Sequence, residues 1–284
     1  MFEENYIELL NISREIREKI LVLHAKSNES HLGSSLSIVD ILVALYFQIL
    51  NIDPLNPYEE DRDRFILSKG HAASALYVVL AKRGFFEEEL LDSFSENGGK
   101  ISVHPERFSV PGVEVSTGSL GHGLSMGVGI ALSAKKDSKS FKTYVLMSDG
   151  ECEEGSVWEA AISASRFKLD NLIGIIDKNK WQAYDRTDKI QNLSLLKSKW
   201  EAFGWSCREV DGHNLQELTQ IFRIIPFEIG KPSMVIADTI KGKGVPEIED
   251  RMEWHYKSPK SDELKKFIES LRKDYEKSIY KKAN

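Results

Sequence analysis

A chain of 284 residues, of which 41% are hydrophobic and 10% aromatic, is long enough to bury a large apolar core. Its 44 acidic residues exceed its 38 basic ones and give a formal net charge of −6, which excludes a general affinity for nucleic acid, because such binding needs a basic surface. The N-terminal segment MFEENYIELL is acidic where a signal peptide is basic, and no apolar run approaches the roughly 20 residues that span a membrane, so we expect a soluble, cytoplasmic protein with no membrane partner.

Helical and strand-like patterns alternate along the chain. In chain order we predict helices at 11–27 and 36–50, a strand at 64–68, helices at 71–83, 86–95 and 123–136, a strand at 144–148, a helix at 154–168, strands at 172–177 and 205–210, a helix at 214–224, a strand at 233–238 and a helix at 261–282. This alternation predicts an α/β fold, with a parallel sheet flanked by helices on both faces. No repeat or linker divides the chain, so we expect one domain over 1–284, with 261–284 a charged surface helix.

Four loops rich in glycine follow or precede the predicted strands, where parallel sheets bind their ligands. They are SKGHAAS (68–74), STGSLGHG (116–123), SDGECEEG (148–155) and DTIKGKG (238–244). None of them has the GxxxxGK[ST] pattern of a phosphate-binding loop. The spacing from Gly121 to Gly127 is GxGxxxG, one residue too long for a dinucleotide fingerprint, so a nicotinamide-binding domain is the weaker interpretation.

Two polar turns follow neighbouring strands and suggest a cation site. A right-handed crossover from strand 144–148 to strand 172–177 brings Asp149 and Asn179 to one edge of the sheet. Their oxygens suit Mg²⁺ or Ca²⁺ that also carries a phosphate ligand. Gly150 allows close approach of the backbone, and we expect the N-terminus of helix 154–168 to help hold the anion. The alternative is that both are ordinary turns, in which Asp, Asn and Gly are common.

This pattern resembles the signature of thiamine diphosphate enzymes, a Gly-Asp-Gly turn followed by an asparagine; here 30 positions separate Asp149 from Asn179, and Ser148 replaces the first glycine. The resemblance narrows to the transketolase family and covers Asn28 to Pro259. SHLGSSLSIVDILVALY, FILSKGHAASALY and VHPERFSVPGVEVSTGSLGHGLSMGVG resemble three blocks of that family, and WEAFGW, EVDGHN and DTIKGKG follow in the family's order. The resemblance implies the family's diphosphate-binding domain and its cofactor.

The resemblance also assigns roles to individual residues. The expected metal ligands are the side chains of Asp149 and Asn179 and the backbone carbonyl of Trp181. In addition to Asp149 and Asn179, the residues expected to bind thiamine diphosphate are His71, Gly118, Ser119, Leu120, Gly150, Glu151 and Ile240, with Leu120 near the aminopyrimidine and Ile240 under the thiazolium.

Three further histidines, His31, His104 and His255, match catalytic positions around the donor sugar, where an imidazole can hold hydroxyls and shuttle protons. Glu154 and Glu159 match glutamates that the family buries at its subunit interface. Each assignment has an ordinary alternative. A loop histidine is often only a hydrogen-bonding residue, and a glutamate in the first turn of a helix is favoured by the helix dipole.

Full-length transketolases add a pyrimidine-binding domain, which carries the glutamate that activates the cofactor, whereas this chain ends at Asn284. We therefore expect the N-terminal subunit of a split transketolase, which transfers a two-carbon ketol unit from a ketose phosphate to an aldose. The expected assembly contains two copies of this chain and two of a C-terminal subunit.

Other interpretations remain open at this stage. A deoxyxylulose phosphate synthase or a 2-oxo acid dehydrogenase subunit would use the same site at Asp149 and Asn179. A non-enzymatic regulatory remnant would be expected to have lost these ligands, and they are present. The segment Trp181–Ile190, WQAYDRTDKI, departs from commoner family versions and is a candidate determinant of the sugar.

Overall fold

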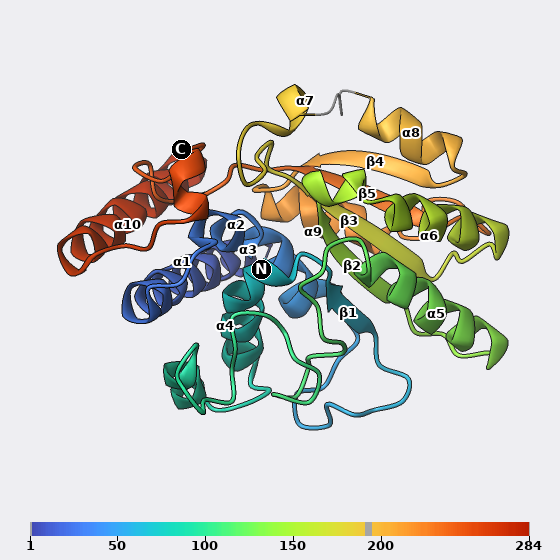
Figure 1. Cartoon of the computed structure of the whole chain (residues 1–284), viewed down its shortest axis with the longest axis horizontal. Helices are drawn as coiled ribbons and strands as arrows, with labels where there is room; N and C mark the ends of the chain where they lie inside the picture. The colour runs from blue at the N-terminus through green and yellow to red at the C-terminus, as the bar shows by residue number, and fades with distance from the viewer. Residues whose placement is uncertain (1, 191–194, 284) are drawn as a thin grey trace.

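The computed structural model of the chain describes residues 2–190 and 195–283, and it is built around a five-stranded parallel sheet (Figure 1). Met1 and Asn284, the outermost bounds of the expected domain, lie outside the described residues. The strands run in the order β1-β2-β3-β5-β4, and every neighbouring pair is parallel. Their bounds are β1 Arg64–Leu67, β2 Thr143–Ser148, β3 Leu172–Lys178, β4 Ser206–Asp211 and β5 Ser233–Asp238. All five predicted strands are confirmed, with small differences at their ends.

The helices follow the predicted order with local differences. The α-helices are α1 Phe2–Ser27, α2 Leu32–Ser37, α3 Val39–Ala44, α4 Ala73–Arg83, α5 Gly123–Lys136, α6 Gly155–Arg166, α7 Thr187–Ile190, α8 Leu196–Ala202, α9 Leu215–Arg223 and α10 Ser261–Ala283. The shorter helical segments are the π-helix η1 Leu45–Ile49 and the 3₁₀ turns η2 Gly70–Ala72, η3 Glu88–Ser93, η4 Gly150–Glu153 and η5 Met252–His255.

Three differences from the predicted helices stand out. The helix predicted at 36–50 is divided into α2, α3 and η1, and only a 3₁₀ turn forms in 86–95. The sequence analysis missed α7 and α8, because a helix as short as α8 buries only Leu196 and Trp200, too few apolar positions to give a helical period.

Helices cover both faces of the sheet, as predicted (Figure 1). On one face, Leu146 and Val235 of the strands share a buried core with α1, α3, α4, α9 and α10. On the other face, Val145 and Met234 pack against α5, α6 and α8. Successive residues of one strand point to opposite faces, so each strand contributes to both cores.

The last helix, α10, packs along α1 and is less exposed than its charged sequence suggests. Phe267, Leu271 and Tyr275 recur at intervals of four residues and are buried on its inner side, because that spacing places them on one helical face. In the part of the chain that the structure describes, we find no helix with the length and apolarity needed to cross a bilayer.

The register of the sheet fixes where the loops meet. Ser148 at the end of β2 pairs with Asp177 of β3, and Asp238 at the end of β5 pairs with both Lys178 and Asp211. Four strands therefore end close to the same level, and the residues that follow them gather at one edge of the sheet.

Candidate active site at the carboxyl ends of the strands

Asp149 follows β2 directly and lies against the end of β3. Its N–H donates to the carbonyl oxygen of Asp177 over 3.2 Å. Its carboxylate accepts hydrogen bonds from the N–H of Gly150 at 2.9 Å, the N–H of Lys180 at 2.9 Å and the hydroxyl of Thr187 at 3.1 Å. The crossover thus brings Asp149 next to the segment that carries Asn179, as the sequence predicted.

Asn179 is held so that its amide oxygen faces away from the buried carboxylate of Asp177. Its Nδ2 donates to Asp177 Oδ2 over 2.7 Å, and its Oδ1 accepts from the N–H of Trp181 over 3.1 Å. The partners fix which atom of the Asn179 amide is nitrogen and which is oxygen, since the carboxylate of Asp177 accepts while the N–H of Trp181 donates. The indole of Trp181 donates to Asp250 Oδ1 over 2.7 Å, and the guanidinium of Arg186 lies 4.4 Å from its ring centroid.

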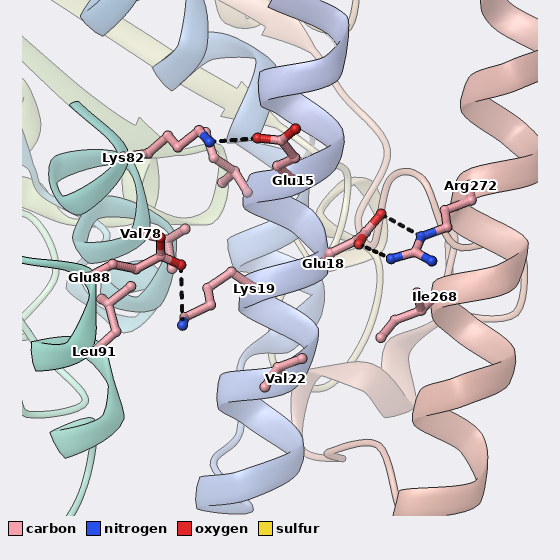
Figure 2. A pocket seen from close by; sticks show the side chains of 11 residues that line it. Glu15, Glu18, Lys19, Val22, Val78, Lys82, Glu88, Leu91, Ile268 and Arg272 are labelled. Carbon is pink, nitrogen blue, oxygen red and sulfur yellow. Dashed lines mark hydrogen bonds and ion pairs between the residues drawn. The ribbon is translucent and has the colours of Figure 1, made fainter. Parts of the chain in front are cut away.

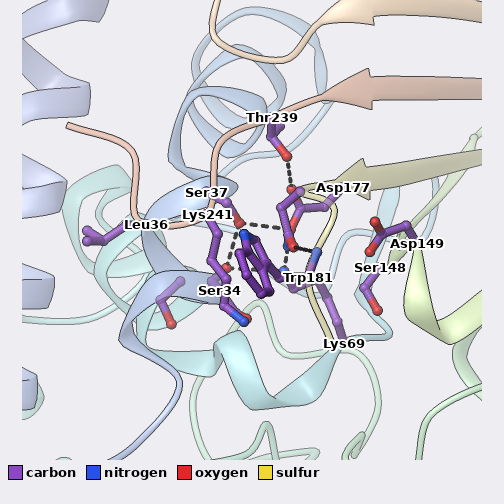
Figure 3. Close-up of polar contacts among 12 residues, drawn as sticks. Ser34, Leu36, Ser37, Lys69, Ser148, Asp149, Asp177, Trp181, Thr239 and Lys241 are labelled. Atoms are coloured by element: carbon purple, nitrogen blue, oxygen red, sulfur yellow. Dashed lines mark hydrogen bonds and ion pairs between the residues drawn. The ribbon is translucent and has the colours of Figure 1, made fainter. Parts of the chain in front are cut away.

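Asp177 is the centre of a buried polar network that the sequence analysis did not identify (Figure 3). Its Oδ2 accepts from Ser37 at 2.8 Å and from the ammonium of Lys69 at 2.5 Å, and its Oδ1 accepts from the hydroxyl of Thr239. Lys69 and Asp177 are both fully buried. Burial alone would raise the pKa of Asp177, but Lys69 and these hydrogen bonds hold it below its usual value.

The donor set around Asp149 fits a divalent cation. Burial, with the charge of Asp177 added, raises the pKa of Asp149 to about 7, so a bound cation would restore its ionised form. Among the described residues no three His, Cys, Asp or Glu side chains are arranged to hold a metal. The ligand set expected from the sequence is different, because it combines one carboxylate with an amide and a backbone oxygen and leaves room for phosphate.

Four histidines from distant parts of the chain gather beside this network. The ring of His31 lies 5.1 Å from that of His71 and 4.8 Å from that of His255, measured between centroids. The N–H of His31 also donates to the carbonyl oxygen of His255 over 2.7 Å. His104 packs against Gly118, where an added Cβ would come within 3.2 Å of the imidazole. The structure thus brings together the histidines selected from the sequence.

His31, His71 and His255 are held in their neutral forms. Burial is the largest cause that lowers the pKa of His31 to about 4 and that of His255 to about 3, and it lowers the pKa of His71 well below its usual value. The ammonium of Lys241 lies 2.9 Å from His255 Nδ1, and burial together with Lys69 lowers the pKa of Lys241 to about 8. Neutral imidazoles can accept protons or hydrogen bonds from hydroxyl groups.

Neither Lys69 nor Lys241 was among the site residues predicted from the sequence. Each is followed directly by a glycine, in the segments SKGHAAS and DTIKGKG, and this repeated Lys-Gly pair was the available signal. The two lysines bring positive charge to a site that the sequence analysis expected to hold a diphosphate.

Gly118 and Ser119 are exposed at the edge of the site, and Leu120 and Ile240 are partly exposed. Glu151 is different, because its side chain is fully buried. Its carboxylate accepts from the hydroxyl of Ser68 and from the N–H groups of Gly121 at 2.8 Å and Ser148 at 3.3 Å. Burial raises the pKa of Glu151, and its side chain joins Ser68 after β1 and Ser148 at the end of β2 to Gly121 in the segment STGSLGHG.

Helix α6 begins within one residue of its predicted start, and a 3₁₀ turn lies between it and Asp149. The 3₁₀ turn η4 occupies 150–153, and α6 begins at Gly155. The turn has a local cause, because the side chain of Asp149 accepts from Gly150 N–H and Ser148 Oγ accepts from Glu151 N–H over 3.1 Å, which closes a tight turn. The expected contribution of the α6 N-terminus to anion binding stays a prediction.

Glu154, the N-cap of α6, and Glu159 within the helix are both exposed, and Ile162 on the same helix is 56% exposed. The exposed surface of α6 therefore includes a large apolar side chain three positions after Glu159.

The structure is an α/β domain with a polar site at the carboxyl ends of its parallel strands, and comparisons identify its family. Residues 12–282 match the family described as transketolase, thiamine diphosphate binding domain. The chain is 42% identical to one of the subunits of the apulose-4-phosphate transketolase of Phocaeicola vulgatus, with 95% of this chain and 96% of the relative covered. It is 40% identical to the 6-deoxy-6-sulfo-D-fructose transketolase subunit SqwG of Clostridium sp., with 95% and 98% covered.

A solved transketolase variant from Pichia stipitis superposes with a TM-score of 0.86 at 29% identity, covering 94% of this chain and 40% of that one. The chain thus spans less than half of that protein but nearly all of the two bacterial subunits. The chain belongs to the transketolase family, whose members are enzymes that transfer ketol groups, and it has the family's thiamine diphosphate-binding domain.

Proposed function

We propose that this chain is the diphosphate-binding subunit of a two-subunit transketolase, which transfers a two-carbon ketol unit from a ketose phosphate to an aldose. The observation that carries the proposal is the gathering of Asp149, Asn179 and four histidines at one edge of the sheet. Two bacterial relatives that are named as single subunits of a transketolase, and are matched over nearly their whole length, support the two-subunit form.

In this proposal Mg²⁺ or Ca²⁺ is held by Asp149, Asn179 and the carbonyl of Trp181. Lys69 and Lys241 bring positive charge close to the diphosphate, which His71, Gly150 and the 3₁₀ turn that carries Glu151 would contact. The residues proposed to lie against the rings of the cofactor are Gly118, Ser119, Leu120 and Ile240. When bound, thiamine diphosphate supplies the electron sink for carbon–carbon bond cleavage.

His31, His104 and His255 are proposed to hold the sugar hydroxyls and to move protons. Their support is geometric, since the rings of His31 and His255 are in edge contact and face His71. Burial lowers the pKa of His31 and His255, so each ring starts neutral and can accept a proton from a sugar hydroxyl.

Two sugar classes are candidates for the donor. One relative is named for apulose 4-phosphate and another for 6-deoxy-6-sulfo-D-fructose. They are similar to this chain to nearly the same degree, at 42% and 40% sequence identity. Both names describe ketoses with an anionic group. We propose a ketose phosphate as the donor, with a sulfonated ketose as the second candidate.

The partner is proposed to be a C-terminal subunit with a pyrimidine-binding domain, in an assembly with two copies of each chain. Glu154, Glu159 and the exposed Ile162 of α6 support an interface on this side of the molecule. An obligate interface of this kind buries more than about 2,000 Å² in total.

The experiment is to co-express this chain with a transketolase C-terminal subunit from the same genome and to measure ketol transfer. The donor panel should contain several ketose phosphates, including apulose 4-phosphate, together with 6-deoxy-6-sulfo-D-fructose. Activity that requires both chains, thiamine diphosphate and Mg²⁺ is expected. Activity of this chain alone would contradict the two-subunit proposal, and activity only towards a 2-oxo acid would contradict the assignment as a transketolase.

A further inference from the structure

The turn Asp211-Gly-His213 after β4 is built to hold one imidazole in a fixed place. The N–H of His213 donates to Asp211 Oδ1 over 2.9 Å, and the N–H of Gly212 donates to the carbonyl of Asp238 over 2.9 Å. A Cβ at Gly212 would come within 2.4 Å of Thr239 Cγ2, so glycine allows the turn to press against the end of β5. His213 is thereby directed towards the residues that follow β5.

Both ring nitrogens of His213 have partners. The backbone N–H of Ile240 donates to Nε2 over 2.8 Å, and Nδ1 lies 2.9 Å from Asp40 Oδ2. An amide N–H can only donate, so Nε2 must be the unprotonated nitrogen. The ring hydrogen therefore sits on Nδ1 and is donated to Asp40. The two partners fix the tautomer and the orientation of the imidazole.

Asp40 is itself held by Arg17. Two parallel hydrogen bonds of 2.9 and 2.7 Å join the guanidinium of Arg17 to the two oxygens of Asp40. Arg17 also donates to the hydroxyl of Tyr275 on α10 and to the carbonyl of Leu36. Burial alone would raise the pKa of Asp40, but Arg17 and His213 hold it well below its usual value, so Asp40 remains an ionised acceptor.

The backbone around Ile240 is fixed on both sides. Thr239 donates its hydroxyl to Asp177, and the N–H of Gly242 donates to the carbonyl of Gly33 over 2.9 Å. Between these points, the backbone N–H of Ile240 donates a hydrogen bond to His213. The chain of contacts thus runs from α1 through Asp40 and His213 to the residue after Thr239 at the edge of the site.

We propose that His213 is a positioning residue, which acts through the backbone of Ile240 to set where the Ile240 side chain meets the cofactor. The inference rests on the proposed function, in which Ile240 lies under the thiazolium ring. His213 touches neither cofactor nor substrate in this account. Small displacements of a supporting residue cost activity because the reacting groups lose their alignment.

Two polar replacements separate positioning from mere stability. In His213→Gln the amide oxygen can reach the place of Nε2 and accept from Ile240, whereas in His213→Asn the shorter amide can reach only Asp40. If His213 positions Ile240, the Gln variant should keep the slow exchange at Ile240 and the affinity for thiamine diphosphate better than the Asn variant. If His213 serves only to satisfy Asp40, Asn should be the better replacement, and that result would overturn the proposal.

The first measurement is backbone hydrogen exchange on the full chain, which needs neither partner nor cofactor. Exchange of the Ile240 amide, followed in peptides that cover 239–244, should be about tenfold faster in His213→Leu and His213→Asn, but close to wild type in His213→Gln, because one hydrogen bond is lost or kept. The matched control is Asn214→Ala, which removes the side chain that caps α9 through the N–H of Glu217. It should destabilise α9 without changing exchange at 239–244. Unchanged exchange in His213→Leu would overturn the proposal.

The second measurement is calorimetry on the assembly with its C-terminal subunit, using two probes. His213→Asn should bind thiamine diphosphate with Mg²⁺ about tenfold more weakly than wild type. Inorganic diphosphate with Mg²⁺ should bind both proteins equally, because it does not reach Ile240. Equal loss for both probes would overturn the positioning role. Failure of the wild-type assembly to bind thiamine diphosphate would instead overturn the proposed function, while the exchange result would stand on its own.

Discussion

Charged side chains are arranged in opposite ways in two regions of the molecule. In the first region, α1 forms a groove with α4, η3 and α10, in which each charged side chain is paired with one of opposite sign (Figure 2). Lys82 and Glu15 lie 2.6 Å apart, Lys19 and Glu88 3.3 Å, and Arg272 and Glu18 2.7 Å. These partners keep contact with solvent, so their pairing contributes little to stability.

At the strand ends, charge is buried and incompletely balanced (Figure 3). Lys69 and Asp177 are both fully buried, and burial raises the pKa of Asp149 while lowering that of Lys241. Such an arrangement costs stability that a ligand can restore, which is typical of binding sites. A hollow surface alone therefore does not indicate function, whereas desolvated charge without full compensation does.

The largest expected effect is at the buried ion pair. Asp177→Ala leaves the ammonium of Lys69 buried without its carboxylate, and we expect the free energy of unfolding to fall by about 3–5 kcal/mol. Urea unfolding measures this. The double variant Lys69→Met with Asp177→Leu removes both charges and should recover much of the loss. A loss below about 1 kcal/mol for the single variant would contradict this expectation, because the buried pair would then contribute as little to stability as the solvated pairs of the groove.

The next effect concerns the cofactor. Asp149→Ala removes the carboxylate ligand, so Mg²⁺-dependent binding of thiamine diphosphate to the assembly should weaken by more than about 100-fold. The fold should remain intact, because Asp149 lies in a loop. Calorimetry measures the affinity. Asp185→Ala, which changes an exposed acceptor in the neighbouring loop, is the control and should leave affinity within about twofold.

Two histidines of the cluster should separate in their kinetics. His71→Ala should weaken the binding of the cofactor more than the binding of the sugar. His104→Ala should instead lower turnover or sugar affinity by about 10²-fold or more. Steady-state kinetics in which cofactor and donor are varied separately measure both effects. The two variants behaving alike would contradict this division of roles.

A smaller, pH-dependent effect belongs to the inner side of α1. His24 is buried, its Nδ1 donates to the carbonyl of Glu29, and burial lowers its pKa to about 4. Because the unfolded chain takes up the proton near pH 6.5, the neutral native ring contributes stability above that pH and loses it as pH falls towards 4. His24→Met lacks this contribution, so its stability difference from wild type should narrow over that range. Chemical unfolding at several pH values tests it, and a constant difference would contradict the account.

The smallest effect is expected in the groove. Glu88→Gln removes the partner of Lys19, yet both side chains remain solvated, so unfolding free energy should change by less than about 0.5 kcal/mol. Thermal or urea unfolding measures it. Cofactor binding and turnover should stay at wild-type values. A loss of activity in this variant would show that the groove contributes to function.

The sequence by itself determined the strands and the meeting of Asp149 with the Asn179 segment. Apolar runs set the strands, and in a parallel sheet joined by right-handed crossovers consecutive strand ends lie on one edge, so spacing along the chain became proximity in space. The histidines His31, His71 and His255 were selected through resemblance to a family rather than by periodicity, because single loop residues leave no periodic pattern.

Only the tertiary structure decided which buried charges share a network. Lys69 and Asp177 are 108 residues apart, and Asp40 and His213 are 173 apart, yet each pair is in hydrogen-bonding contact. Local patterns report backbone geometry over a few turns or strands, whereas these contacts depend on the strand order and on the packing of α1 against α3 and α10. The pKa values, the His213 tautomer and the amide orientation of Asn179 follow from those contacts, because burial and partners fix them together.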